Sequence, residues 1–261
     1  MRHESYKISL VVMESICGKT ARNMERICAY MEQAGREGAR LVVFPELSLT
    51  SYCLEHAADA ALPLSHPYID VLQEAAQKAG ITALVGMVEA GDTTCYISQL
   101  VCGMDGSLQV YRKTHLGERE KSVFSAGDNI PVFQAEWPLG IGICYDMHYP
   151  ELAATVRQRG AELIASPHAS PGKAGRREDV WAKYMPARAY DERVYVACCN
   201  ACGSNGCGTE FAGGMAVYAP NGSVAAADFS GKEAMMTLEL SSVSFEGAKD
   251  FPMHRRPELY I

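Results

Sequence analysis

Short apolar runs alternate with helical stretches along most of this chain. Residues 41–44 are apolar at every position, which is typical of a strand that is buried on both faces. Residues 20–34 instead carry apolar side chains at three- and four-residue spacing, and this spacing predicts a helix. Strands and helices that alternate in this way predict an α/β fold, in which helices cover mixed sheets.

The same patterns predict the remaining elements. Further strands are predicted over residues 6–13, 82–88, 94–101, 108–112, 132–136, 140–143, 163–165, 194–199, 215–218, 224–227 and 235–240. Further helices are predicted over residues 67–79, 151–159 and 177–192, and Pro186 is expected to kink the last of them. Residues 113–129, 166–175 and 203–214 are interpreted as loops. Because the 261 residues contain neither a repeat nor a linker, we expect a single domain over residues 1–261.

Charge and cysteine content narrow the class of protein. The 31 acidic residues outnumber the 24 lysines and arginines and give a net charge of −7, whereas binders of nucleic acid and anionic membranes normally carry a basic excess. The chain starts with charged residues and lacks an apolar stretch of signal-peptide length. We therefore expect a cytoplasmic protein that binds neither nucleic acid nor membrane. The ten cysteines are interpreted mostly as reduced thiols.

Three residues with reactive side chains closely follow predicted strands in the sequence. Glu46 follows the strand at 41–44, Lys113 follows the strand at 108–112, and Cys144 follows the strand at 140–143. In open α/β sheets, sites assemble at the carboxyl ends of strands. Taken singly, each residue has an ordinary alternative: an exposed carboxylate, a solvated lysine and an inert core thiol.

Taken together, these residue types indicate nucleophilic catalysis. A thiol with a pKa near ~8.5 is only a few per cent thiolate at neutral pH, so it needs a base. A carboxylate kept away from water can be that base, because desolvation raises its proton affinity. A lysine ammonium beside them can stabilise the oxyanion that forms when the thiol attacks a carbonyl carbon.

The residues around these three positions strengthen this interpretation. Residues 44–47 read Phe-Pro-Glu-Leu, residues 111–116 read Tyr-Arg-Lys-Thr-His-Leu, and residues 142–146 read Gly-Ile-Cys-Tyr-Asp. In these motifs and their order the chain resembles the carbon–nitrogen hydrolase (nitrilase) superfamily. The resemblance implies a four-layer α-β-β-α sandwich with two mixed sheets, assembled as a homodimer or a higher homo-oligomer.

The resemblance also implies roles for individual residues. Glu46 is the expected general base, Lys113 the residue that stabilises the tetrahedral intermediate, and Cys144 the nucleophile. The backbone N–H of Tyr145 is expected to be a second oxyanion donor. Glu120 stands seven residues before Gly127, the offset at which the family often has a supporting carboxylate. Its alternative is a charge in a solvated run of charged residues.

Other candidate positions are weighed against ordinary alternatives. His148, His168 and Asn200 are expected to line the substrate pocket. The region from Cys198 to Cys207 contains a C-x-x-C, but no second pair lies nearby, so we interpret it as a core strand followed by a loop. No metal and no cofactor are expected. The family commonly has glycine where Ser51 stands, which questions the conformation of the loop behind Glu46.

These observations predict a cysteine-dependent hydrolase of a non-peptide C–N bond. The expected substrate is a small amide or N-carbamoyl compound, which is cleaved through a thioester with release of ammonia or an amine. Two alternatives stay open. A nitrile reacts through a thiol adduct of the same kind, and an inactive family member would act as a binding module.

Overall fold

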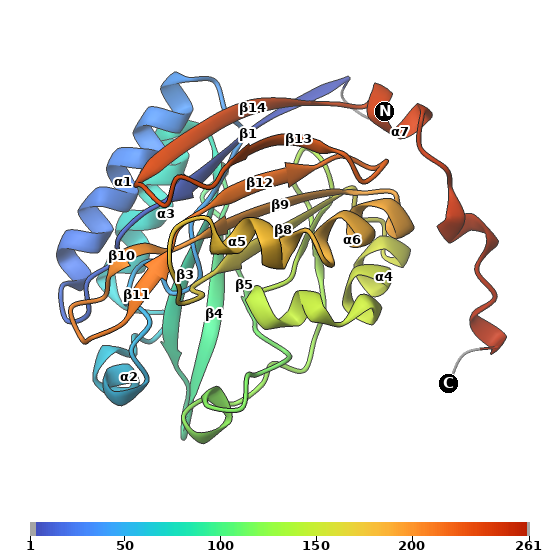
Figure 1. The fold of residues 1–261 in the computed structure, drawn as a ribbon. Helices are drawn as coiled ribbons and strands as arrows, with labels where there is room; N and C mark the ends of the chain where they lie inside the picture. Colours follow the sequence, from blue (N-terminus) through green and yellow to red (C-terminus); the bar gives the residue numbers. More distant parts are fainter. Residues whose placement is uncertain (1–3, 260–261) are drawn as a thin grey trace.

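The computed structural model describes residues 4–259 and shows two six-stranded sheets packed face to face (Figure 1). In the first sheet the strand order is β14 (Ala234–Ser241), β1 (Ser5–Val12), β2 (Leu41–Val43), β3 (Thr82–Ala90), β4 (Cys95–Cys102) and β5 (Leu108–Arg112). In the second sheet it is β13 (Val224–Asp228), β12 (Met215–Tyr218), β9 (Tyr195–Asn200), β8 (Leu163–His168), β7 (Leu139–Ile141) and β6 (Val132–Phe133). Both sheets mix parallel and antiparallel pairs.

Helices cover the outer faces of both sheets. The first sheet is covered by α1 (Thr20–Arg36) and α3 (Pro67–Ala79), and the second by α4 (Pro150–Gln158), α5 (Arg176–Trp181) and α6 (Met185–Glu192) (Figure 1). Two short helices, α2 (Ala57–Ala60) and α7 (Val243–Glu246), complete the α-helices of the described range. The predicted α-β-β-α sandwich is therefore confirmed. Residues 1–3 and 260–261, the ends of the predicted domain, lie outside the described residues.

The apolar run in β2 shows how the layers pack. Leu41 and Val43 belong to the buried cluster between the sheets, together with Leu139 and Ile141 of β7. Val42 points the other way and packs in the cluster formed with α1 and α3. Successive side chains of a strand point to opposite faces, so a strand with a layer on each side needs an apolar residue at every position.

The prediction of one kinked helix over residues 177–192 is wrong. The structure has two helices there, α5 and α6, separated by residues 182–184. Pro186 lies in the first turn of α6. The first N–H groups of a helix have no intrahelical partner, so proline, which has no N–H, costs no hydrogen bond at this position.

Residues 166–175 and 203–214, which are predicted as loops, also include strand residues. Strand β8 continues through His168, and Pro167 pairs with Cys199 of β9. Proline is tolerated there because β7 pairs with β8 only as far as Ala165, so one side of the strand is open at Pro167. Residues 203–214 contribute to a two-stranded sheet of β10 (Cys202–Ser204) and β11 (Glu210–Ala212).

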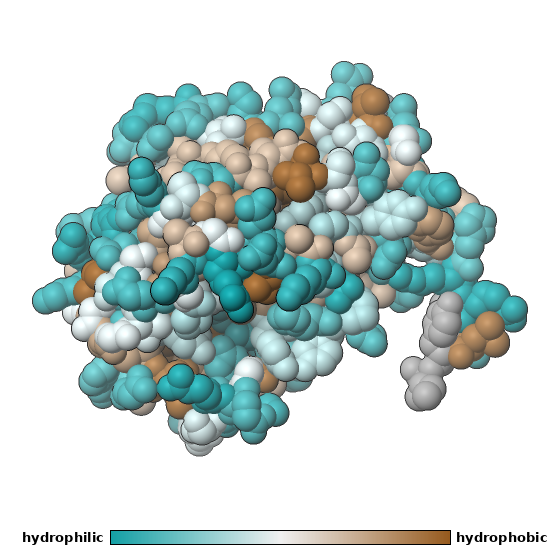
Figure 2. All heavy atoms as spheres, in the orientation of Figure 1, coloured by the Kyte–Doolittle hydropathy of each residue, from teal (hydrophilic) through white to brown (hydrophobic). Residues whose placement is uncertain are grey.

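The surface agrees with this layering. Figure 2 shows many hydrophilic residues with hydrophobic ones scattered among them on the face that is drawn. This is expected where helices turn their apolar sides toward a sheet. Within residues 4–259, none of the helices combines the length and the apolar character needed to cross a membrane.

Candidate active site

The three residues singled out at strand ends meet between the two sheets. Glu46 and Lys113 follow strands β2 and β5 of the first sheet, and Cys144 follows β7 of the second. The Nζ atom of Lys113 donates a hydrogen bond to Oε1 of Glu46 at 2.7 Å, and both side chains are 1% exposed. The other oxygen of Glu46 accepts from the backbone N–H of Ala169, beyond β8, at 2.9 Å. Glu46 is therefore held from both sheets.

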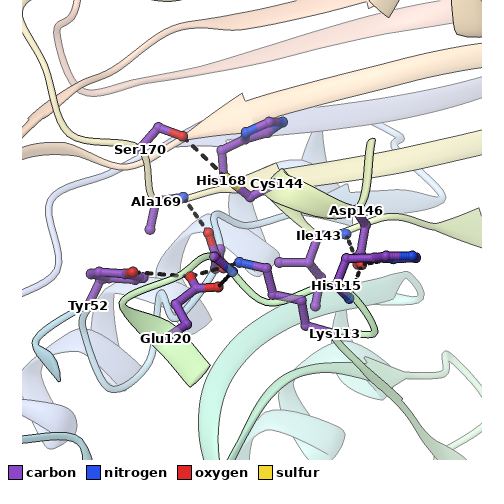
Figure 3. Close-up of polar contacts among 12 residues, drawn as sticks. Tyr52, Lys113, His115, Glu120, Ile143, Cys144, Asp146, His168, Ala169 and Ser170 are labelled. Carbon is purple, nitrogen blue, oxygen red and sulfur yellow. Dashed lines mark hydrogen bonds and ion pairs between the residues drawn. The ribbon is translucent and has the colours of Figure 1, made fainter. Parts of the chain in front are cut away.

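Glu120 joins this arrangement from the irregular segment after β5. Its Oε1 accepts from Nζ of Lys113 at 2.9 Å and from the hydroxyl of Tyr52 at 3.0 Å (Figure 3). Its Oε2 accepts from the backbone N–H of Gly117 at 2.7 Å. Glu120 is buried, so the alternative of a solvated charge is excluded. The ammonium of Lys113 thus lies between two carboxylates.

Cys144 stands at a sharp turn between β7 and a 3₁₀ helix, Cys144–His148. Its φ angle is +47°, in the left-handed region that residues with a Cβ seldom adopt. Its Sγ lies 3.3 Å from Oγ of Ser170. Tyr145 follows directly, so its backbone N–H belongs to the same turn. The turn presents a half-buried thiol to the space next to Glu46 and Lys113.

Asp146 holds the cysteine turn against the lysine segment. Its buried carboxylate accepts from the backbone N–H groups of Ile143 at 2.9 Å and His115 at 2.8 Å. It also accepts from the hydroxyl of Tyr111 at 2.8 Å. Sequence reasoning gave Asp146 no role, although it stands inside the motif at 142–146. Tyr52 and Ser170 were missed as well, and no pattern in the sequence marks them.

Burial and neighbouring charges together shift the pKa values of the three groups in this site. Burial and then the Glu46 carboxylate raise the pKa of the Cys144 thiol to about 12, so the resting thiol keeps its proton. Burial raises the pKa of Glu46 above its ordinary value, and the nearby Lys113 opposes this rise. Burial alone would lower the pKa of Lys113, but Glu46 and the other acidic groups around it raise it well above its ordinary value. A charged lysine therefore stands beside a carboxylate with raised proton affinity and a protonated thiol.

The three predicted pocket residues lie in different surroundings. His148 is exposed and contacts the ring of Tyr184, with 4.4 Å between the ring centroids. His168 is buried, and burial followed by the charge of Arg177 holds its pKa well below its ordinary value. Asn200 is buried, and its side chain accepts from the backbone N–H of Ser170 at 2.7 Å and donates to the backbone carbonyl of Ser170 at 3.1 Å. In this position Asn200 fixes the loop that carries Ser170 toward the thiol.

Ser51 stands where the resembling family commonly has glycine. Its φ angle of +69° is in the left-handed region, which explains why glycine is common at this position. The hydroxyl of Ser51 donates to the backbone carbonyl of Ser15 at 2.7 Å. This hydrogen bond offsets part of the conformational cost, and the loop keeps Glu46 in the site.

The cysteines at 198–207 do not form one cluster. Cys198 and Cys199 are buried in β9, and they belong to the clusters on opposite faces of the second sheet. Cys207 is exposed and lies instead with Cys17 and Cys53, with the three sulfur atoms all within 4.8 Å of one another. Sequence reasoning missed this group because its members are far apart in the chain.

Comparisons with known proteins give a family and match the fold. The profile of the carbon–nitrogen hydrolase family matches residues 7–249. A solved amidase from Nesterenkonia sp. AN1 superposes with a TM-score of 0.87 at 25% sequence identity, over 99% of this chain and 97% of that chain. A structure of a mutant of that amidase superposes with a TM-score of 0.86 at 25% identity, over 98% of this chain and 95% of that chain. That mutant shows covalent addition of the acetamide moiety of fluoroacetamide at its active-site cysteine.

Curated relatives are similar over most of their length. Omega-amidase NIT2 of Pongo abelii is 30% identical over 204 residues, which is 74% of this chain and 73% of the relative. A hydrolase encoded in the pqqF 5′ region of Pseudomonas protegens is 34% identical over 249 residues, which is 92% of this chain and 85% of the relative.

Proposed function

This chain belongs to the carbon–nitrogen hydrolase family, and we propose that it hydrolyses a small amide through a thioester on Cys144. That it is a carbon–nitrogen hydrolase acting on amides is supported by its relatives. The observation that carries the finer proposal is the position of Lys113, whose Nζ lies 2.7 Å from Glu46 and 2.9 Å from Glu120. A base, a charged donor and a thiol then share one water-poor site.

In the first step the sulfur of Cys144 attacks the amide carbon while Glu46 takes the thiol proton. A general base is needed because the thiol, with its pKa of about 12, is not ionised beforehand. The carbonyl electron pair moves onto oxygen. A lysine ammonium has three N–H bonds, and Lys113 uses two of them on Glu46 and Glu120. The third N–H and the backbone N–H of Tyr145 remain for the oxyanion.

In the second step the tetrahedral intermediate collapses and the C–N bond breaks. Glu46 passes its proton to the departing nitrogen, so ammonia or an amine leaves and a thioester remains on Cys144. Glu46, again a carboxylate, then takes a proton from water as the water oxygen attacks the thioester carbon. The second intermediate releases a carboxylic acid, and the proton returns to sulfur. Atoms and charges balance over the cycle without a cofactor.

Glu120 is proposed as a positioning residue in this scheme. It contacts Lys113 and is itself fixed by the hydroxyl of Tyr52 and the N–H of Gly117. Two carboxylates alone in such a site would repel, and one of them would take up a proton. The single ammonium between them allows Glu46 to remain ionised and act as the base.

Arg177, which acts on two of the predicted pocket residues, favours a substrate with an anionic group. Arg177 is half-buried, and its buried Nε has no hydrogen-bond partner among the described residues. After burial, its charge lowers the pKa of His168, and it also lowers the pKa of His148, where burial and Arg188 contribute more. An arginine placed in this way can bind a carboxylate. We therefore propose the monoamide of a dicarboxylic acid as the substrate class, a choice that agrees with the name omega-amidase of the relatives.

The test is ammonia release from a matched panel of substrates. The panel pairs the monoamide of a dicarboxylic acid with the methyl ester of the same monoamide, and adds an N-carbamoyl compound and a nitrile. The free acid is expected to have the highest kcat/KM, and intact mass should show an acyl adduct that is lost in Cys144→Ala. A faster nitrile or carbamoyl compound would overturn the substrate class. Turnover by Cys144→Ala would overturn the mechanism.

A further inference from the structure

Three thiols from distant parts of the chain meet outside the candidate active site. Cys17 lies between β1 and α1, Cys53 lies in the loop behind Glu46, and Cys207 lies in the connection between β10 and β11. Their sulfur atoms are all within 4.8 Å of one another. We propose that Cys17, Cys53 and Cys207 bind a zinc ion, with His56 as the fourth ligand.

The spacing of the sulfurs suits a thiolate metal site. In a tetrahedral zinc site the Zn–S bonds of ~2.3 Å place the sulfurs ~3.8 Å apart. Because the sulfurs are all within 4.8 Å of one another, each pair needs to approach by at most about 1 Å. Each thiol gives its proton to solvent as its sulfur bonds to zinc, and the divalent cation balances two of the three thiolate charges. A disulfide would use two of the sulfurs and leave the third unpaired, whereas a metal ion uses all three.

The side chain of His56 is 55% exposed and lies outside the group of sulfurs, so it must turn toward them to be the fourth ligand. His56 and Asp59 lie on one side of the cluster. They line a pocket of about 420 Å³ together with Cys17 and Cys207. Nδ1 of His56 lies 3.8 Å from Oδ2 of Asp59. This separation is too long for a hydrogen bond, so Asp59 leaves the His56 ring able to turn toward the sulfurs. A site of three cysteines and one histidine is a frequent zinc site. The exposed Cys207 and the pocket give the ion a path from solvent.

Asn205 holds the three cysteine segments together without a metal. Its backbone carbonyl accepts from the N–H of Cys17 at 2.9 Å, and its Oδ1 accepts from the N–H of Cys207 at 2.8 Å. Its Nδ2 donates to the backbone carbonyl of Tyr52, the residue before Cys53, at 2.8 Å. One side chain and its backbone therefore fix all three segments. Such preorganisation lowers the conformational cost of binding a metal.

The site is connected to the catalytic carboxylates through Tyr52. Its backbone is held by Asn205, and its hydroxyl donates to Oε1 of Glu120 at 3.0 Å. Zinc bound at Cys53 would fix the segment that carries this hydroxyl. We therefore expect a structural site, which stabilises the loop behind Glu46 and takes no part in the chemistry at Cys144.

The experiment measures zinc on the purified, reduced, full-length protein. The protein is stripped with a chelator, exposed to excess zinc and freed of unbound metal before elemental analysis. We expect one equivalent of zinc per chain for the wild type and for Cys95→Ser, a matched control outside the cluster. We expect loss of zinc in Cys53→Ser and weaker binding in His56→Ala. Zinc should also raise the melting temperature of the wild type but not that of Cys53→Ser.

Two results would overturn the proposal. One is equal zinc content in the wild type and Cys53→Ser, since the ion would then be bound elsewhere. The other is reduced protein that takes up no zinc. This result counts against the proposal even if the mass before reduction shows the loss of two hydrogens to a disulfide. Cobalt substitution gives an independent reading, because thiolate-to-cobalt charge-transfer bands should appear in the wild type and be lost in Cys53→Ser. None of these measurements depends on amide hydrolysis.

Discussion

Replacing Lys113 by methionine tests the charge arrangement of the site directly. Lys113→Met roughly keeps the length of the side chain but removes the ammonium that donates to Glu46 and Glu120. The two carboxylates keep only neutral donors, which are Ala169 for Glu46 and Tyr52 and Gly117 for Glu120. We expect one carboxyl group to take up a proton, because two unpaired charges cannot both be kept in a buried site.

The expected magnitudes follow from the loss of one buried lysine between two carboxylates. Breaking a buried ion pair costs about 3–5 kcal/mol, which for a chain of this size lowers the melting temperature by roughly 6–20 °C. Loss of one oxyanion donor lowers kcat by about 10²–10³. Partial protonation of Glu46 lowers it further, so we expect a fall of about 10³ at neutral pH. Since the oxyanion exists only after attack, KM should change less than kcat.

The assay is ammonia release over a range of pH, together with a thermal melt. Without the cation the pKa of Glu46 rises further, so the acid limb of the remaining rate should move to higher pH. Lys121→Met is the matched control, because Lys121 lies on the same segment with its side chain 60% exposed. A kcat near that of the wild type, or an acid limb that does not move, would refute the reasoning.

Three further predictions concern the groups around the thiol. Glu46→Gln should lower kcat by about 10²–10⁴ and slow alkylation of Cys144 by iodoacetamide; unchanged values of both would make Glu46 a bystander. Asp146→Asn replaces the carboxylate that accepts from the N–H groups of Ile143 and His115 by an amide. The melting temperature and kcat should both fall, and an unaltered kcat would contradict the role of Asp146 in positioning. In the wild type, kcat/KM should fall as the pH drops through the raised pKa of Glu46, so an acid limb at or below the ordinary value of about 4.3 would argue against this base.

Elements bounded by backbone signals were predictable from the sequence. The helix predicted over residues 67–79 has these bounds in the structure, because Pro67 begins it and Gly80 ends it in the left-handed conformation with φ +66°. The break between α5 and α6 carried one such signal, Pro186 in the first turn of α6, but Pro186 was interpreted as a kink within one helix. Trp181 and Met185 are buried in the same cluster on both sides of the break, so the apolar spacing continues through it. Periodicity alone therefore predicted one helix.

The site was predictable to the extent that strand ends and local motifs define it. Glu46, Lys113 and Cys144 each follow a strand, and the fold brings them together. The offset between Glu120 and Gly127 also has a structural cause. Gly127 donates to the backbone carbonyl of Lys113 at 2.8 Å, and a Cβ there would lie 2.4 Å from the carbonyl of Arg112. The loop that carries Glu120 must return to the lysine strand at a glycine.

The contacts that complete the site come from packing between sheets, which the local sequence does not encode. Glu46 follows a strand of the first sheet, but its carboxylate accepts a hydrogen bond from the backbone N–H of Ala169, which follows β8 of the second sheet. Asp146 follows a strand of the second sheet, but its carboxylate accepts a hydrogen bond from the hydroxyl of Tyr111 on β5 of the first sheet. These hydrogen bonds connect the two sheets in both directions. Glu46, Lys113 and Cys144 therefore come together only when the two sheets pack in this one relative position. The large apolar cluster between the sheets fixes this relative position, and the layer that stabilises the fold thereby also positions the reactive groups.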